Sequence, residues 1–127
     1  MLIMKQVNIY CDGACSNKNG GYAVILNYKD NKKVISGSES ETTNNRMEML
    51  AAITGLKALK FPCEVKLYSD SQLLVNTMNK NWKRNKNIDL WQQIDELNKC
   101  HQITWIWVKR NSLPEMAECD RVAKSMK

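Results

Sequence analysis

The sequence predicts an α/β protein with a five-stranded mixed sheet flanked by helices. Three observations predict it. Runs rich in β-branched and aromatic residues come first and pair as hairpins. Runs with helical spacing of apolar residues follow. Short strand-like runs then alternate with these helices, which adds parallel strands to the antiparallel hairpins.

The amino-terminal half supplies the hairpins. Residues 5–11 are predicted to form a strand that closes at Asp12. The segment 16–21, "SNKNGG", is a turn in which Gly and Asn supply positive φ. Residues 22–28 and 32–40 then form a hairpin around "KDN".

Helices dominate the remainder of the chain. Apolar residues at i, i+3, i+4 and i+7 predict a largely buried helix over 44–59. A short strand over 64–69 leads into a helix through 73–78. A further helix through 90–97 precedes a strand over 102–108.

The last helix is expected to open at Ser112, with Glu115 three residues later. This spacing is typical of a capping box, in which the serine is the N-cap residue. The predicted order is therefore β-β-β-α-β-α-α-β-α.

Composition limits the class of protein. The chain has 127 residues, of which 43% are hydrophobic and 25% charged, and this predicts one globular domain over 1–127. No apolar run approaches the ~20 residues that span a bilayer, and no signal peptide is recognised. The five cysteines form no paired CxxC pattern, so we expect reduced thiols in a cytoplasmic protein, with a metal at Cys11 and Cys15 as the alternative.

The net charge of +6 suits a polyanionic partner, nucleic acid above all, although simple solubility is the alternative reading. Part of this charge gathers around Trp82, where Lys80, Lys83, Arg84 and Lys86 lie within a few residues.

Four acidic residues occupy positions that favour a metal site. Asp12 and Asp70 follow predicted strands, where ligands gather in α/β sheets. Glu48 lies in the buried helix, and Asp120 lies one to two turns into the last helix. Crowded carboxylates repel one another unless a divalent cation lies among them, and hard oxygen ligands select Mg²⁺ or Mn²⁺. Each acid alone has another reading, as a turn, cap, surface or ion-pair residue, and spacing by itself does not show that the four converge.

Four motifs in order resemble the type 1 ribonuclease H family: "YCDGACSNKNGGYA", "TTNNRMEMLAA", "YSDSQLL" and "AECDRVAK". The similarity extends over about residues 5–126. It implies the ribonuclease H-like fold and endonucleolytic hydrolysis of the RNA strand of RNA–DNA hybrids, leaving 5′-phosphate and 3′-hydroxyl ends.

The resemblance also implies roles for particular residues. The catalytic and metal-binding quartet falls on Asp12, Glu48, Asp70 and Asp120, which are expected to hold two Mg²⁺ ions ~4 Å apart, with Mn²⁺ as the alternative metal. The residues expected to bind the hybrid are Thr43, Asn44, Asn45, Gln72, Trp82, Lys83 and Arg84. Amides suit contacts to the 2′-hydroxyl because they both donate and accept, whereas helix capping is the alternative for Asn44 and Asn45.

Three features depart from the family pattern. Leu113 stands nearest to a loop histidine found in many bacterial members, and the single histidine, His101, is read as a solvated surface residue. The basic protrusion is cut short to "NKNWKRNKN", and Glu41 replaces a basic residue beside the phosphate pocket. We expect activity to persist with a weaker grip on the hybrid.

Two other functions stay open on the sequence alone: a hybrid-binding module without catalysis, and a DNA nuclease of the same broad fold. The four acids argue against the first and "TTNNRME" with Gln72 against the second. The length suggests a free-standing monomer, with no membrane partner.

Overall fold

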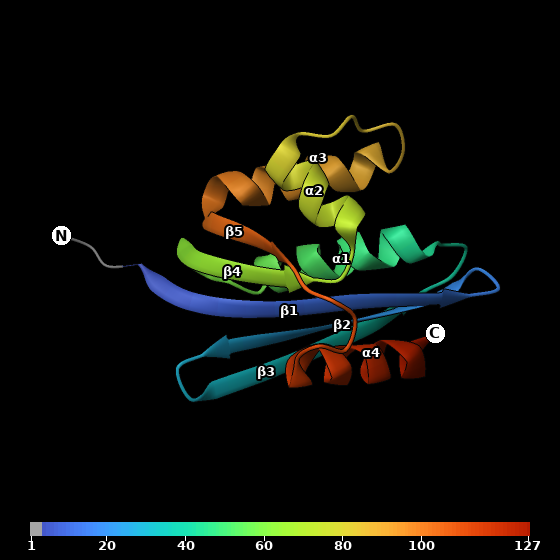
Figure 1. The fold of residues 1–127 in the computed structure, drawn as a ribbon, viewed down its shortest axis with the longest axis horizontal. Helices are drawn as coiled ribbons and strands as arrows, with labels where there is room; N and C mark the ends of the chain where they lie inside the picture. Colours follow the sequence, from blue (N-terminus) through green and yellow to red (C-terminus); the bar gives the residue numbers. More distant parts are fainter. Residues whose placement is uncertain (1–3) are drawn as a thin grey trace.

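The computed structural model describes residues 4–127, and its element order is the predicted one (Figure 1). The strands are β1 (Lys5–Ser16), β2 (Asn19–Tyr28), β3 (Asn31–Glu39), β4 (Cys63–Ser69) and β5 (Gln102–Trp107). The helices are α1 (Asn44–Lys57), α2 (Gln72–Lys80), α3 (Ile88–Cys100) and α4 (Pro114–Met126).

The five strands form one mixed sheet in the order β3-β2-β1-β4-β5. β1 pairs antiparallel with β2 and β2 with β3, as expected of consecutive hairpins. β4 lies parallel to β1 on one side and to β5 on the other. The predicted mixed sheet is therefore confirmed.

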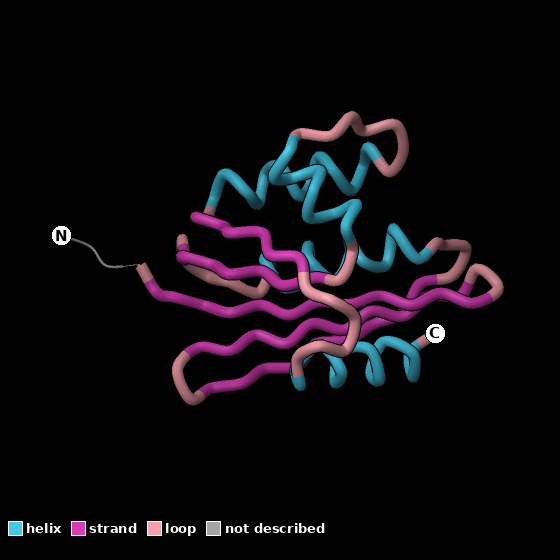
Figure 2. The backbone as a smooth tube through the Cα atoms, viewed as in Figure 1, coloured by secondary structure: helices cyan, strands magenta, loops and turns pink. Residues whose placement is uncertain are grey.

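Helices cover both faces of the sheet. Helices α1, α2 and α3 lie on one side and α4 lies on the other (Figures 1 and 2). The larger core joins α1 and α3 to the sheet, and residues such as Ile9, Ile53 and Ile94 are fully buried in it. A smaller core under α4 holds Met116 and Cys119. Within the described part of the chain, none of the helices has the length and apolar character needed to cross a bilayer.

The first strand runs further than predicted. Asp12 does not end it, because β1 continues to Ser16 and Asp12 pairs with Ala23 of β2. What ends before Asp12 is the parallel pairing with β4, whose last partners are Tyr10 and Tyr68. Pairing with β2 therefore extends β1 beyond the point where its pairing with β4 ends.

The turn after β1 agrees with the prediction in part. Positive φ comes from Asn17 (51°), as expected of an asparagine, and from Lys18 (66°), whereas the described glycines have none. Gly20 and Gly21 belong to β2 instead, where side chains would not fit. A Cβ on Gly21 would lie 2.1 Å from the carbonyl oxygen of Ala123 in α4. These glycines let helices approach the sheet closely.

The predicted capping box at the last helix is wrong. Helix α4 begins at Pro114, and its N-cap residue, Leu113, makes no side-chain capping bond. Proline suits the first helical position because its missing N–H has no intrahelical partner there. The Ser112 hydroxyl donates to the carbonyl oxygen of Lys109 within the preceding loop.

Candidate active site

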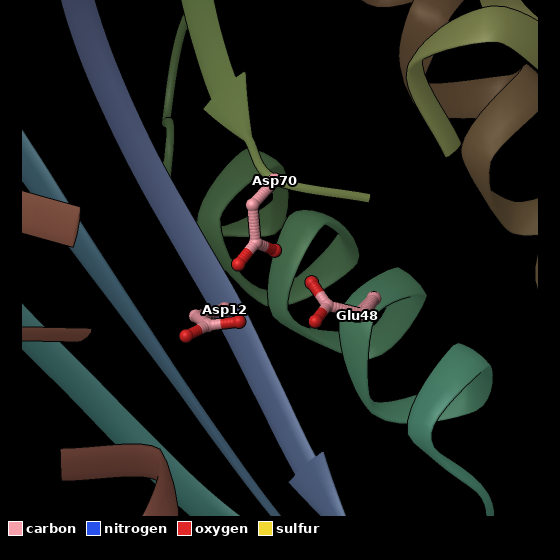
Figure 3. Close-up of side chains that lie close together, drawn as sticks. All are labelled: Asp12, Glu48 and Asp70. Atoms are coloured by element: carbon pink, nitrogen blue, oxygen red, sulfur yellow. The ribbon is translucent and has the colours of Figure 1, made fainter. Parts of the chain in front are cut away.

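Three carboxylates from three elements meet at one edge of the sheet. Asp12 comes from β1, Glu48 from α1, and Asp70 from the residue directly after β4 (Figure 3). One oxygen from each lies within 4.8 Å of the others. The side chains point toward one another across a small space, which suits a shared cation.

Strand register brings Asp12 and Asp70 together. Tyr10 and Tyr68 are the last partners of the parallel β1–β4 pair, and their rings stack with centroids 4.7 Å apart. Asp12 and Asp70 each follow two residues later, beyond the end of the ladder. The carboxyl ends of parallel strands are where ligands collect in α/β sheets.

Gly13 allows Glu48 to approach the two aspartates. A Cβ at Gly13 would lie 2.5 Å from the backbone nitrogen of Glu48, so only glycine permits this closeness between β1 and α1. The N-terminus of α1 is fixed by Thr43, whose Oγ1 accepts from the backbone nitrogen of Arg46 at 3.2 Å. Glu48 therefore enters the site from a helix held at its first turn.

Burial makes the three carboxylates costly to ionise together. Asp12 is buried, and its pKa is raised to about 6, first by desolvation and then by the charges of Asp70 and Asp120. Desolvation also raises the pKa of Glu48 well above its usual range, with the nearby charges of Asp12 and Asp70 adding to it. The pKa of Asp70 rises for the same first reason, and Arg110 partly opposes it.

Asp120 lines the same cavity but lies outside the three-carboxylate cluster. The cavity has a volume of about 610 Å³ and is lined by all four acids. Asp120 comes from α4, on the opposite face of the sheet, and its carboxylate pairs with Lys124 at 3.0 Å and with Arg110 at 3.4 Å. The four acids thus share one cavity, but the close cluster contains three.

The amides predicted to contact the hybrid surround the carboxylates. Asn44, Asn45 and Gln72 all line the cavity, together with residues 12–15. Thr43 does not line it, and its hydroxyl is occupied as the cap of α1. Capping, the alternative reading that we gave to Asn44 and Asn45, is thus performed by Thr43.

The basic segment near Trp82 divides into exposed and anchored residues. Trp82 is 42% exposed and Lys83 is exposed, both in the loop between α2 and α3 (Figure 2). Arg84 is ion-paired with Asp95, and its guanidinium lies 4.9 Å from the centroid of the Trp91 ring. Lys83 and Arg84 line a neighbouring cavity of about 210 Å³, which Asn45 also lines.

Arg46 joins α1 to the start of α3. It pairs with Asp89 at 2.8 Å and donates to the side-chain oxygen of Asn87 at 3.2 Å. The guanidinium holds the pKa of Asp89 down to about 2. Arg46 does not line the cavity that holds the acidic cluster.

The sequence-based interpretation of His101 is wrong. His101 is not a solvated histidine, because its Nδ1 accepts a hydrogen bond from the backbone nitrogen of Cys63 at 3.0 Å and burial lowers its pKa. Trp107, at the end of β5, is 45% exposed, lines the cavity, and donates from Nε1 to the carbonyl oxygen of Asp70 at 3.1 Å. Trp91 and Trp105 are buried.

Leu113 and Glu41, two of the residues that depart from the family pattern, lie outside the carboxylate cavity. Leu113 packs against the core under α4 and is absent from the cavity lining. Glu41 has a φ of 51° and lies 3.8 Å from Lys18, with both side chains largely exposed. Neither residue contacts the carboxylates.

Arg110 and Lys124 also line the cavity, and the sequence analysis did not identify either residue as part of the site. A signal for Lys124 was present, because it follows Asp120 by four residues in a helix and so faces it. Arg110 carried no such signal, since its position depends on the path of the loop between β5 and α4.

Sequence comparison identifies the family. A model of the RNase H family matches residues 4–127. The chain belongs to the ribonuclease H family. It is similar to a ribonuclease H of Acetivibrio thermocellus, with 49% identity over 94% of this chain and 93% of that protein. A ribonuclease H of Caldanaerobacter subterraneus subsp. tengcongensis is 52% identical over 92% of this chain and 88% of its own length.

Solved structures agree on the fold of this ribonuclease H family member. The N-terminal RNase H domain of a Mycobacterium tuberculosis protein superposes with a TM-score of 0.85 at 24% identity, covering 96% of this chain and 93% of that chain. LC11-RNase H1, crystallised in complex with an RNA/DNA hybrid, gives a TM-score of 0.82 at 22% identity and 94% coverage of both chains. The predicted ribonuclease H-like fold is therefore confirmed.

Proposed function

We propose that this chain is an endonuclease that hydrolyses the RNA strand of RNA–DNA hybrids in the 610 Å³ cavity, leaving 5′-phosphate and 3′-hydroxyl ends. Asp12, Glu48 and Asp70 hold divalent cations there, and Asp120 completes the ligand set from the other face of the sheet. Membership of the ribonuclease H family supports the reaction, and the arrangement of carboxylates supports the residues.

One observation carries the metal assignment. Oε2 of Glu48 is buried and has no hydrogen-bond partner among the described residues, although two other carboxylates lie within 4.8 Å. An unpaired buried carboxylate oxygen is costly, and the raised pKa values of Glu48 and its neighbour Asp12 express the same penalty. A hard cation removes both costs, so the donor set fits Mg²⁺ or Mn²⁺.

Two bound Mg²⁺ ions would supply a water of lowered pKa and charge stabilisation at the scissile phosphate. The chain itself holds the anionic oxygens rigidly, because each comes from a strand end or a helix fixed against the sheet. Arg110 and Lys124 place positive charge at the rim of the cavity, where a phosphodiester backbone is attracted.

Choice of RNA over DNA requires groups that contact the 2′-hydroxyl. Asn44, Asn45 and Gln72 lie beside the carboxylates, and each side-chain amide offers both donors and an acceptor. We assign these three residues to the minor groove of the hybrid. Lys83 and Trp82, exposed in the adjoining loop, extend the contact along the duplex. We also predict that the protein uses Mg²⁺ in preference to Mn²⁺, that it is a monomer, and that it is cytoplasmic.

Cleavage of defined substrates tests the proposal. Labelled RNA–DNA hybrid, double-stranded RNA, double-stranded DNA and single-stranded RNA are incubated with Mg²⁺, Mn²⁺ or a chelator. The wild type is compared with Asp70→Asn and with Asp30→Asn, which changes an exposed aspartate in the β2–β3 turn and serves as the matched control.

Cleavage of the hybrid alone, lost in Asp70→Asn and with the chelator but kept in Asp30→Asn, is the expected result. Tight hybrid binding without cleavage would identify a binding module instead. Cleavage of DNA would identify a DNA nuclease of the same fold.

A further inference from the structure

Asp70 lies at the junction between β4 and α2, and a tryptophan from β5 is hydrogen-bonded to its backbone. The indole Nε1 of Trp107 donates to the carbonyl oxygen of Asp70 at 3.1 Å. We propose that Trp107 is a positioning residue, which holds the Asp70 carboxylate in place for a divalent cation. This inference rests on the metal site of the proposed function, and it gives a role in that site to a residue outside the carboxylate cluster.

Local hydrogen bonds fix the residues on either side of Asp70, which directly follows the end of β4 (Figure 3). The backbone nitrogen of Ser71 donates to Oγ of Ser69 at 3.0 Å. Oγ of Ser71, the N-cap residue of α2, accepts from the backbone nitrogen of Leu74 at 3.1 Å. Neither bond involves the carbonyl group of Asp70. The indole of Trp107 therefore supplies the contact that fixes this peptide group from another element.

The indole is itself attached to a well-anchored strand. Trp107 is the last residue of β5 and lies opposite Ser69 in the parallel ladder with β4. The backbone nitrogen of Val108 donates to the carbonyl oxygen of Ser69 at 3.0 Å. On the other side of the junction, Nδ2 of Asn79 in α2 donates to the carbonyl oxygen of Trp105 at 3.0 Å. Hydrogen bonds therefore join β5 to both elements that flank Asp70, and the donor cannot easily drift.

The Asp70 carboxylate depends on its backbone for its position. Among residues 4–127, no lysine or arginine forms an ion pair with it. One of its oxygens lies within 4.8 Å of oxygens from Asp12 and Glu48, and ionised carboxylates this close repel one another. Groups that orient a ligand in advance raise its affinity for the metal. The bond from Trp107 opposes the outward movement that this repulsion favours.

A comparison within β5 separates this role from ordinary packing. Trp105 is buried, and its Nε1 donates to Oδ1 of Asn98 in α3 at 3.2 Å, away from the cavity lining. Trp107 lines the cavity and is nearly half exposed. A tryptophan stabilises a fold mainly through the apolar area that it buries, and Trp107 buries much less of its own than Trp105. Its hydrogen bond to Asp70 is therefore the feature that packing does not explain.

An isosteric replacement of the indole N–H tests the inference. In 3-benzothienylalanine a sulfur atom replaces the indole nitrogen, so the ring stays and the donor is lost. Trp107→benzothienylalanine is made by amber suppression, and Trp105→benzothienylalanine is the matched control, because it removes an indole hydrogen bond from the same strand. Isothermal titration calorimetry measures Mn²⁺ binding to the protein without substrate. Thermal melts and steady-state cleavage of the hybrid at several Mn²⁺ concentrations complete the comparison.

We expect the Mn²⁺ dissociation constant to rise about five- to tenfold in Trp107→benzothienylalanine, because one hydrogen bond that orients a ligand residue is lost. At low Mn²⁺ the kcat should fall and should recover as Mn²⁺ is raised, while KM for the hybrid changes by less than about twofold. Trp105→benzothienylalanine should lower the melting temperature at least as much, because its bond is buried, and should bind Mn²⁺ like the wild type.

Unchanged Mn²⁺ binding in Trp107→benzothienylalanine, with normal binding in the wild type, would overturn this inference and leave the proposed function intact. Equal weakening in both variants would indicate a general loss of structure, and a raised KM with unchanged Mn²⁺ binding would assign Trp107 to the substrate surface. Each of these results would also overturn the inference. A wild type that binds no Mn²⁺ would contradict the proposed metal site itself, and the role of Trp107 with it.

Discussion

The ammonium of Lys124 lies 3.0 Å from Oδ2 of Asp120, one turn earlier in α4, while Arg110 approaches Oδ1 at 3.4 Å. Asp120 is therefore neutralised by the protein itself. The cluster of Asp12, Glu48 and Asp70 forms no ion pair with any lysine or arginine in the described residues. A cation that binds all four acids must compete with Lys124 and Arg110 for the fourth.

Replacing Lys124 by methionine should strengthen metal binding. The substitution removes an ammonium that competes for Asp120, while a side chain of similar length remains. Because the pair is partly exposed, the gain should be about two- to fivefold in the dissociation constant for Mn²⁺, measured by isothermal titration calorimetry. Arg121→Met, on the same helix but outside the cavity lining, is the control. Weaker metal binding in Lys124→Met would show that Lys124 supports the site instead of competing for it.

Asp12 should make the metal-free protein less stable as the pH rises. Its pKa in the folded state is about 6, above the usual 3.8, so the folded state holds the proton more tightly than the unfolded state. Relative to Asp12→Asn, the wild type should therefore lose free energy of unfolding between about pH 4 and pH 7, by about 2 to 3 kcal/mol. Denaturant titrations with chelator across this range measure the difference.

Added Mg²⁺ should restore most of this loss in the wild type at pH 7 and little of it in Asp12→Asn. Asp30→Asn controls for the removal of an exposed charge. A difference between wild type and Asp12→Asn that stays constant with pH would contradict the ionisation penalty.

Gly13→Ala should separate β1 from α1 and disturb the carboxylates. The added Cβ would meet the backbone of Met47 and Glu48 at 2.5 Å, and backbone atoms cannot rotate away. We expect a loss of about 1–3 kcal/mol in stability and at least a tenfold fall in kcat for hybrid cleavage. In Gly37→Ala the added atom meets only the outer end of the Tyr22 side chain, so near-normal kcat is expected. Equal activity of the two variants would argue against this role of Gly13.

Substitutions of Lys83 and Arg84 should have different effects, the first on substrate binding and the second on stability. Lys83→Ala should raise KM for the hybrid and reduce the salt dependence of binding by about one counterion, because an exposed lysine contacts phosphate. Arg84→Ala should chiefly lower the melting temperature, because Arg84 is ion-paired with Asp95 and packed on Trp91. Melting curves and steady-state kinetics at two salt concentrations test both. An unchanged KM in Lys83→Ala would remove this loop from the substrate surface.

The fold was predictable because local and long-range signals agree. The apolar spacing of α1 and the β-branched runs of β1 to β3 identify their elements, and the observed boundaries differ from the predicted ones by only a few residues, except at β1. The strand end at Asp12 and the cap at Ser112 were mispredicted. Both errors have one cause: a strand's length and a helix's first residue depend on partners that local sequence does not reveal.

The candidate site was only partly predictable. Asp12 and Asp70 stood out because each lies near a strand end, and Glu48 because a charge in a buried helix needs compensation. Trp107 and Arg110 could not be assigned to the cavity, since the path of the chain after β5 decides where they point. The separation of Asp120 from the other three acids follows from its place on the opposite face, which only the structure reveals.

The most direct test of the metal site is a crystal grown with Mn²⁺ and measured for anomalous scattering at the manganese edge. We expect a peak among the carboxylate oxygens of Asp12, Glu48 and Asp70, and no such peak in Glu48→Gln crystals grown in the same way. A crystal with ordered carboxylates and no peak in this space at saturating Mn²⁺ would contradict it.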